Sequence, residues 1–227
     1  MLNQDKDLSI LRNNRALAFW EILSVVSSVL IVEWALLSLV PNKRFLIAFP
    51  VVLAVGLIVF SHRIRGVSAR DPGWRTDNFG KALRLLLLPM LLGTIVVVIK
   101  GWLSGSLRLA MPRSRWAFLW LPALGLAWGL LQQAVLQGFI NRRAQMIWGS
   151  GPVSIFVVAL IFALLHLPNL GLMLATFVGG LIWAAIYQRA PNLIALGISH
   201  CVMTWVIITT IPQVALQHLR VGYKFFG

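Results

Sequence analysis

The sequence predicts an all-α integral membrane protein, a polytopic helical bundle of about seven spans. Hydrophobic residues make up 59% of the 227 residues, and the mean hydropathy is +0.85. Charged residues make up only 11%, whereas a soluble domain usually has about 25%. The apolar residues also fall into separate runs, and a spanning helix needs about 20 residues of this kind. Together these observations leave no room for a separate soluble domain.

Seven apolar runs justify the expected spans, taken in chain order. The second and fifth runs are the shortest and are the weakest candidates for a crossing. The runs cover residues 16–40, 45–60, 82–99, about 116 to the glutamine cluster at 132–137, 153–167, 170–187 and 193–211. We expect two parts: residues 1–80 with the N-terminal spans and a basic polar loop, and residues 81–227 with the core.

The formal net charge of +14 would suggest nucleic-acid binding in a soluble protein. Here the basic residues are spread through the loops between apolar runs, beside 10 tryptophans. This pattern is typical of residues at lipid headgroups. The expected partners are therefore the lipid bilayer and its anionic lipids, with no nucleic acid. With a cytoplasmic N-terminus, the cytoplasmic loops hold 12 of the 20 basic residues, which favours this orientation.

The polar residues in the late apolar runs are the candidates for function. No Asp or Glu follows Asp77, so these runs contain no carboxylate. Polar side chains within a membrane face the bundle interior or a water-filled cavity, and residues four apart share a helix face. We expect one intramembrane pocket to collect Gln132, Gln133, Gln137, Phe162, His166, His200 and Thr204.

These residues fall into three short motifs along the chain. The chain reads Gln-Gln-Ala-Val-Leu-Gln at 132–137, Phe-Ala-Leu-Leu-His at 162–166 and His-Cys-Val-Met-Thr at 200–204. Residues 73–211 thereby resemble the CPBP family of intramembrane metalloproteases (CAAX protease and bacteriocin-processing, also called Abi). The family pattern is Glu-Glu-x-x-x-Arg, Phe-x-x-x-His and His-x-x-x-Asn. The order, the spacing and the two histidines carry the resemblance.

The resemblance implies a zinc ion held by histidines and a glutamate, with a second glutamate that activates the attacking water. This chain has Gln132 and Gln133 at the positions of both glutamates and Gln137 at the position of the arginine. An amide is a poor metal ligand and cannot accept a proton near neutral pH. His166 and His200 could still bind a metal, but without the glutamates the expectation is that no cofactor is bound.

Glu33, within the first span, is the carboxylate that could replace the missing base. An intramembrane carboxylate is a functional candidate by default, although a structural role as a partner of Arg or His is the simpler interpretation. Glu21 is expected nearer the membrane face. The glutamines could equally form an interhelical hydrogen-bond network.

Four interpretations follow from these residues. The favoured one is a non-catalytic member of the family, a pseudoprotease that binds a membrane segment, a lipid or a partner protein. The alternative is a metal-dependent intramembrane endopeptidase with an atypical Gln-Gln motif. An acid pair replaced to trap an enzyme is disfavoured by the further differences at Gln137 and Thr204. A transporter has no visible inverted repeat. The resemblance implies a bacterial cytoplasmic membrane.

Overall fold

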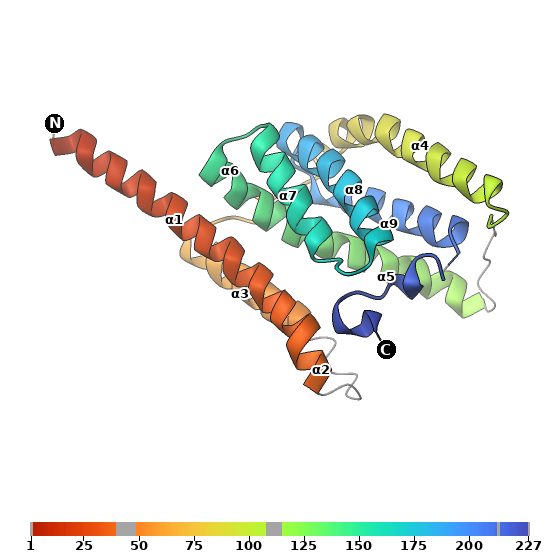
Figure 1. Cartoon of the computed structure of the whole chain (residues 1–227). Helices are drawn as coiled ribbons and strands as arrows, with labels where there is room; N and C mark the ends of the chain where they lie inside the picture. The colour runs from red at the N-terminus through yellow and green to blue at the C-terminus, as the bar shows by residue number, and fades with distance from the viewer. Residues whose placement is uncertain (1, 40–48, 108–114, 213, 227) are drawn as a thin grey trace.

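The computed structural model describes residues 2–39, 49–107, 115–212 and 214–226, which contain helices and no strand (Figure 1). The all-helical prediction is confirmed. The helices are α1 (Leu2–Ile31), which continues through η1 (Val32–Leu36) into α2 (Leu37–Leu39), α3 (Phe49–Ile64), α4 (Phe79–Leu103), α5 (Arg115–Gln133), which continues through η3 (Ala134–Asn141) into α6 (Arg142–Trp148), α7 (Pro152–Leu164), α8 (Leu170–Arg189), α9 (Leu193–Thr210), η4 (Gln217–Leu219) and η5 (Gly222–Phe225).

Five helical segments are long and apolar enough to cross a membrane: Asn13–Leu39, Phe79–Leu103, Leu121–Trp148, Leu170–Arg189 and Leu193–Thr210. The two shorter apolar helices are α3 and α7, which correspond to the two runs expected to be weakest. The expected second span begins at residues 45–48, which lie outside the described residues, as does residue 40 at the end of the first.

The expected end of the fourth span at the glutamine cluster is wrong. The helix passes through the glutamines as a π-helical segment, η3, and continues as α6 to Trp148. It ends where Gly149 and Gly151 adopt φ values of 79° and 140°. Residues that carry a Cβ atom rarely adopt such positive φ values. Pro152 then begins α7, a position where its missing N–H leaves no hydrogen bond unmade.

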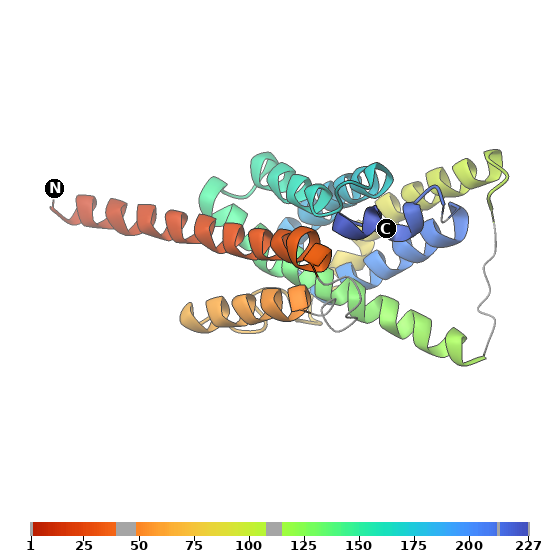
Figure 2. The same ribbon diagram turned by 60° about the horizontal axis from the view of Figure 1, so that its bottom comes forward.

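Glycines allow the core helices to approach closely. A Cβ atom on Gly129 of α5 would lie 2.7 Å from the carbonyl oxygen of Gly197 on α9. A Cβ atom on Gly180 of α8 would lie 2.9 Å from Cα of Ala159 on α7, so small residues allow close packing here, as they do between membrane helices in general. Figure 2 shows α5 and α9 on one side of the bundle and α7 and α8 on the other.

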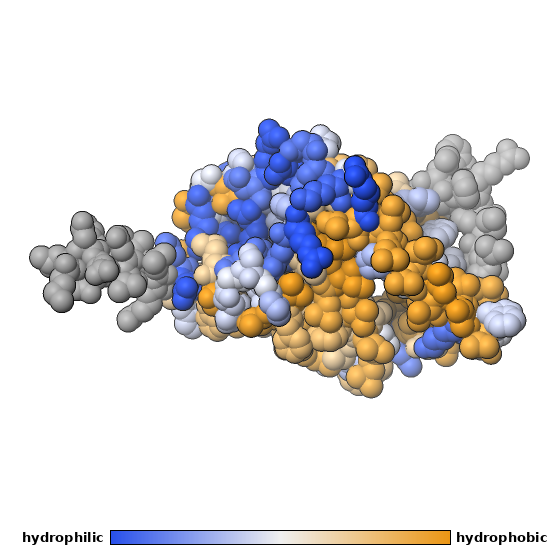
Figure 3. All heavy atoms as spheres, turned by 90° about the horizontal axis from the view of Figure 1, so that it is seen from above, coloured by the Kyte–Doolittle hydropathy of each residue, from blue (hydrophilic) through white to orange (hydrophobic). Residues whose placement is uncertain are grey.

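Loops that are distant in sequence meet at one end of the bundle, which we call the basic end. The hydroxyl of Tyr187 donates to the carbonyl of Pro72 over 2.9 Å. The backbone N–H of Leu193 donates to the carbonyl of Gly73, also over 2.9 Å. The basic polar loop therefore packs on the turn between α8 and α9. Seen from above, hydrophilic residues gather toward one end of the molecule, beside a broad hydrophobic surface (Figure 3).

The opposite end of the bundle is closed by the C-terminal segment. The backbone N–H of Gly222 donates to the carbonyl of Leu167 over 2.8 Å. The side-chain amide of Asn169, which is buried, donates to the carbonyls of Leu216 and Arg220 over 2.8 and 3.1 Å. The connection between α7 and α8, directly after His166, is thus held by the end of the chain.

Candidate functional site

His200 lies on α9 and is buried between α5 and α8. Its Nδ1 atom is 3.0 Å from Nε2 of Gln133 on α5. Its ring stacks on the indole of Trp183 on α8, with 4.6 Å between the ring centroids and 5° between the planes. Trp183 itself donates from Nε1 to the hydroxyl of Ser199 over 3.0 Å. Three helices therefore fix the orientation of this imidazole.

His166 follows α7 and is half-buried. Its Nδ1 atom lies 2.7 Å from the carbonyl oxygen of Phe162, an acceptor, so Nδ1 carries the proton. The Phe162 ring lies edge-on to the His166 ring, with centroids 5.0 Å apart, and 6.1 Å from the His200 ring. The structure thus brings Phe162, His166, His200 and Gln133 together.

The protonation of the two histidines differs. His166 donates from Nδ1, which leaves a lone pair on Nε2. Nδ1 of His200 faces Nε2 of Gln133, an amide nitrogen that can only donate. The neutral imidazole of His200 therefore carries its proton on Nε2. In this arrangement His200 has no free lone pair to offer to a metal.

Gln137 belongs to a second set of hydrogen bonds, formed only by neutral groups. Its Oε1 atom accepts from Nδ2 of Asn141 over 2.7 Å. The Oδ1 atom of Asn141 accepts from Gln145 over 3.0 Å and from Gln188 over 3.1 Å. Gln188 also donates to Ser154 over 3.0 Å. A chain of amides therefore connects η3 to α6, α7 and α8.

Two atoms of these buried glutamines have no hydrogen-bond partner among the described residues. They are Oε1 of Gln133 and Nε2 of Gln137, and both side chains are 0% exposed. Buried polar atoms are nearly always paired, so each such exception needs an explanation.

Gln132 and Thr204 are less closely integrated than the other predicted site residues. Both are half-buried. Within the described part of the chain, no hydrogen bond joins either side chain to His166 or His200. Their assignment to the site rests on the motif and stays a prediction.

Glu33 lies in η1, next to the C-terminal segment rather than next to a histidine. A Cβ atom on Gly222 would lie 2.9 Å from the Glu33 carbonyl oxygen, and Gly222 bonds in turn to Leu167. Oε2 of Glu33 is buried and has no hydrogen-bond partner in the described part of the chain. Among the described residues, no hydrogen bond or ion pair joins Glu33 to His166 or His200.

The other carboxylates with described side chains are engaged elsewhere. Glu21 accepts from Arg65 and Arg143, each over 2.8 Å. Asp71 and Asp77 lie in the basic polar loop, where hydrogen bonds from Ser68 lower the pKa of Asp71. A hydrogen bond from Arg75 lowers the pKa of Asp77 to about 2. None of the three is placed to act as a base beside His200.

The side chains do not fit a catalytic zinc site. Such sites use three protein ligands and one open position. Among the described residues, no group of three His, Cys, Asp or Glu side chains is close enough to hold a metal. Nδ1 of His200 is also engaged by Gln133, so only His166 has a free lone pair in this arrangement. We therefore derive no reaction step through a metal.

The comparison with family models finds a match to the part of the chain that carries the motifs. Residues 114–206 match the family described as Type II CAAX prenyl endopeptidase Rce1-like. This segment is similar to that family. The Rce1-like segment contains all three motifs and confirms the predicted resemblance, over less than half of the chain and without α4. No curated protein and no solved structure matches the chain.

Two site residues, Trp183 and Asn141, were missed from the sequence. The tryptophans are expected mostly at the membrane interface, yet Trp183 is buried and stacks on His200. The sequence signal for Trp183 is Gly179, four residues earlier on the same helix face. A Cβ atom at Gly179 would lie 2.8 Å from the Trp183 ring. Asn141 continues the spacing of Gln133 and Gln137 by another four residues, which could have identified it as part of the same face.

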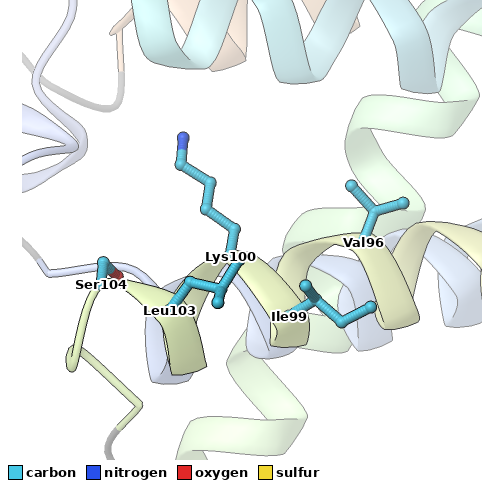
Figure 4. A pocket seen from close by; sticks show the side chains of 5 residues that line it. All are labelled: Val96, Ile99, Lys100, Leu103 and Ser104. Atoms are coloured by element: carbon cyan, nitrogen blue, oxygen red, sulfur yellow. The ribbon is translucent and has the colours of Figure 1, made fainter.

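A hollow on the surface of α4 lies apart from these residues. Figure 4 shows its lining, which consists of Val96, Ile99, Lys100, Leu103 and Ser104. None of the motif residues contributes to it. This apolar surface belongs to a helix that is long enough to span a membrane, so lipid contact explains it.

Proposed function

We propose that this chain is a non-catalytic member of the CAAX-protease-like family, which binds a membrane segment, a lipid or a partner protein without cleaving it. The contact between Gln133 and His200 is the main support. A carboxylate at this position would accept a proton, whereas the amide of Gln133 donates a hydrogen bond to Nδ1 over 3.0 Å. A positioned general base contributes about 10²–10⁴ in rate, and neither glutamine of the motif can supply it.

The missing charge also supports this proposal. The family pattern pairs acids with an arginine, whereas here Gln133, Gln137 and Asn141 form a neutral, fully buried stripe. Uncompensated charges are costly within a membrane. Glutamines at the positions of both acids and of the arginine therefore keep similar side-chain volumes in the bundle and leave no unpaired charge there. Such a bundle can present its surface and interior to a ligand while lacking the means of hydrolysis.

Metal content of the detergent-purified protein tests the proposal. The protein and a His166→Ala, His200→Ala variant are incubated with zinc, washed and analysed by elemental mass spectrometry. We expect no stoichiometric zinc in either. About one zinc per chain, lost in the double variant, would overturn the proposal. A Gln132→Glu, Gln133→Glu variant is the positive control, because it restores the family's carboxylates and should gain zinc.

The second candidate is the metal-dependent endopeptidase with Glu33 as the replacement base. One observation favours it: among the described residues Oε2 of Glu33 is buried without a hydrogen-bond partner, and Gly222 connects its backbone to the residue after His166. This candidate requires zinc binding in the experiment above. It also requires that the Glu33→Gln variant lose peptide hydrolysis while Glu21 is left unchanged.

A further inference from the structure

The C-terminal segment contains a left-handed turn. Gln217, His218 and Leu219 adopt φ values of 47°, 53° and 60°. Residues other than glycine rarely adopt such values, because the Cβ atom then approaches the following carbonyl oxygen. The N–H of Leu219 donates to the carbonyl of Leu216 across the turn, over 2.9 Å. Backbone in this conformation persists only where the surrounding structure holds it.

Asn169 holds both ends of this turn. Its Oδ1 atom accepts from the backbone N–H of Leu172, at the start of α8, over 3.1 Å. Because that N–H can only donate, the orientation of the amide is determined and Nδ2 faces the C-terminal segment. Nδ2 donates to the carbonyl of Leu216 before the turn and to that of Arg220 after it. One buried side chain therefore joins the start of α8 to both ends of the turn.

The residues after the turn contact η1. Gly222 has a φ of 58°, and a Cβ atom there would lie 2.9 Å from the Glu33 carbonyl oxygen and 3.0 Å from Glu33 Cβ. The N–H of Gly222 donates to the carbonyl of Leu167. Farther along, the Phe226 ring lies against the Trp34 ring, with centroids 6.2 Å apart. The C-terminal segment thus docks between η1 and the connection from α7 to α8, as Figure 1 shows.

Docking of this segment buries little apolar surface. Within residues 214–226, only Leu216 and Gly222 are buried. Hydrogen bonds and one aromatic contact therefore provide most of the attachment, and the left-handed turn opposes it. Segments with few buried apolar contacts open locally while the rest of a protein stays folded. Release of this segment would also allow the three residues of the turn to return to ordinary φ values.

We propose that residues 214–226 form a strap that docks on the connection after His166 and releases from it as one unit. Asn169 fastens the strap, and the left-handed turn favours its release. In the released state, the carbonyl of Leu167 and the amide of Asn169 lose these partners and become available beside His166. The strap thereby opens and closes this end of the bundle. This inference goes beyond the proposed function, since it is the same for a protein that binds a ligand and for one that cleaves it.

Hydrogen–deuterium exchange of the full-length protein in detergent, measured by mass spectrometry, tests the strap. Asn169→Asp keeps the oxygen that caps α8, and Asp caps helices as well as Asn does, but it removes both N–H donors to the turn. We expect exchange within the strap to become about tenfold faster, because these hydrogen bonds are lost. Asn192→Asp is the matched control. Asn192 caps α9 and donates from Nδ2 at the basic end, so exchange within the strap should not change.

A second pair of variants acts through glycine. Gly222→Ala adds a Cβ atom against Glu33 and should release the strap. Gly105→Ala is the control, because Gly105 has a similar φ of 63° but a Cβ atom there meets nothing within 4 Å. It introduces comparable backbone strain outside the strap. Exchange within α9 is the internal reference for all four variants, since a variant that unfolds as a whole speeds exchange there as well.

In the unaltered protein, we expect the strap to exchange more slowly than a free peptide of the same sequence and faster than α9. Exchange as fast as in the free peptide would mean that the segment does not dock. Exchange as slow as in α9 would mean that it does not release. Either result would overturn the proposal, and so would the absence of an effect of Asn169→Asp or Gly222→Ala on the strap. Zinc binding leaves each of these outcomes unchanged, so the two proposals fail separately.

Discussion

An amide in place of a carboxylate changes the direction of a hydrogen bond at His200. A glutamate would accept from Nδ1 and leave the lone pair on Nε2. Gln133 donates to Nδ1, so the proton moves to the far side of the ring. The stacking of His200 on Trp183 does not depend on this choice. The ring can therefore remain well packed although its chemical role has changed.

Replacing Gln133 by leucine is expected to destabilise the protein by about 1 kcal/mol, because Nδ1 of His200 then has no donor. Thermal unfolding in detergent measures this change. Gln132→Leu is the matched control, since Gln132 is the adjacent glutamine, is only half-buried and has no bond to either histidine. An equal loss in the two variants would mean that the contact with His200 contributes nothing specific.

At the level of single residues, spacing predicts which side chains can meet but not how they bond. The intervals between Gln133 and Gln137 and between Phe162 and His166 place each pair on one face. Hydrogen-bond direction depends on tertiary neighbours. The free nitrogen of Gln137, for example, is determined by Gly151, which lies at the start of another helix. No pattern within η3 contains that information.

Close packing of whole helices positions the site. Gly129 on α5 faces the backbone of Gly197 on α9, four residues from Gln133 and three from His200. If the two helices moved apart, the 3.0 Å contact between Gln133 and His200 would break. The absence of side chains at these two glycines is therefore a condition for the polar contact.

We expect Gly129→Ala to destabilise the protein by about 1–3 kcal/mol, the usual cost of overpacking. Its Cβ atom would lie 2.7 Å from the Gly197 carbonyl oxygen and 3.3 Å from the Cys201 nitrogen. Gly56→Ala in α3 is the control, because a Cβ atom there meets nothing within 4 Å. Thermal unfolding compares the two variants. A Gly129→Ala protein as stable as Gly56→Ala would show that α5 and α9 can separate freely.

Charge joins α1 and α3 to α6. Glu21 on α1 accepts from Arg65, which follows α3, and from Arg143 on α6, while Ser61 bonds to Glu21 and Arg143. The Arg143 side chain is 2% exposed and that of Glu21 is 15% exposed. A buried guanidinium that loses its carboxylate keeps its desolvation cost without the compensating attraction.

Glu21→Gln is therefore expected to cost about 3 kcal/mol or more, which should appear as a lower midpoint of thermal unfolding. Asp77→Asn is the control at pH 7. It also removes a carboxylate paired with an arginine, but the Asp77 side chain is exposed. If the two variants unfolded alike, the contact of α1 with α6 would have to depend on apolar packing alone.

The sequence predicts where helices lie better than it predicts that α5, η3 and α6 form one continuous helix. Apolar run lengths locate α4, α8 and α9 to within a few residues. The glutamine cluster misleads, because polar residues usually mark the end of a span. Here they stay within the helix because the other helices supply hydrogen-bond partners for them. Continuity through η3 is therefore a tertiary property, which composition along one segment cannot reveal.

Contacts between loops show how the helices run through the whole molecule. The loops around residues 72, 151 and 191 contact one another or α8 at the basic end. The turns near residues 106, 167 and 210 meet one another or the C-terminal segment at the opposite end. Each helix from α4 to α9, including the short α7, therefore connects the two ends, with α5, η3 and α6 acting as one.

The basic residues follow the same division. Described residues at or near the basic end include Arg65, Arg70, Arg75, Lys81, Arg142 and Arg189. Glu21 also lies there through its contact with Arg143, so the N-terminal part of α1 extends from this end, as Figure 1 shows. Because basic residues favour the cytoplasmic side, the expected orientation places this end and the N-terminus in the cytoplasm.

Single cysteines test this arrangement in a Cys201→Ser background, with Ser68→Cys and Ser150→Cys at the basic end and Ser104→Cys at the other. All three serines are exposed. A membrane-impermeant maleimide should label Ser104→Cys in intact cells, and the other two only after permeabilisation. Labelling of Ser68→Cys alone would contradict end-to-end crossing by the helices between residues 79 and 148. Labelling of Ser68→Cys and Ser150→Cys without Ser104→Cys would keep the fold but reverse its orientation, and the charge argument would then be wrong.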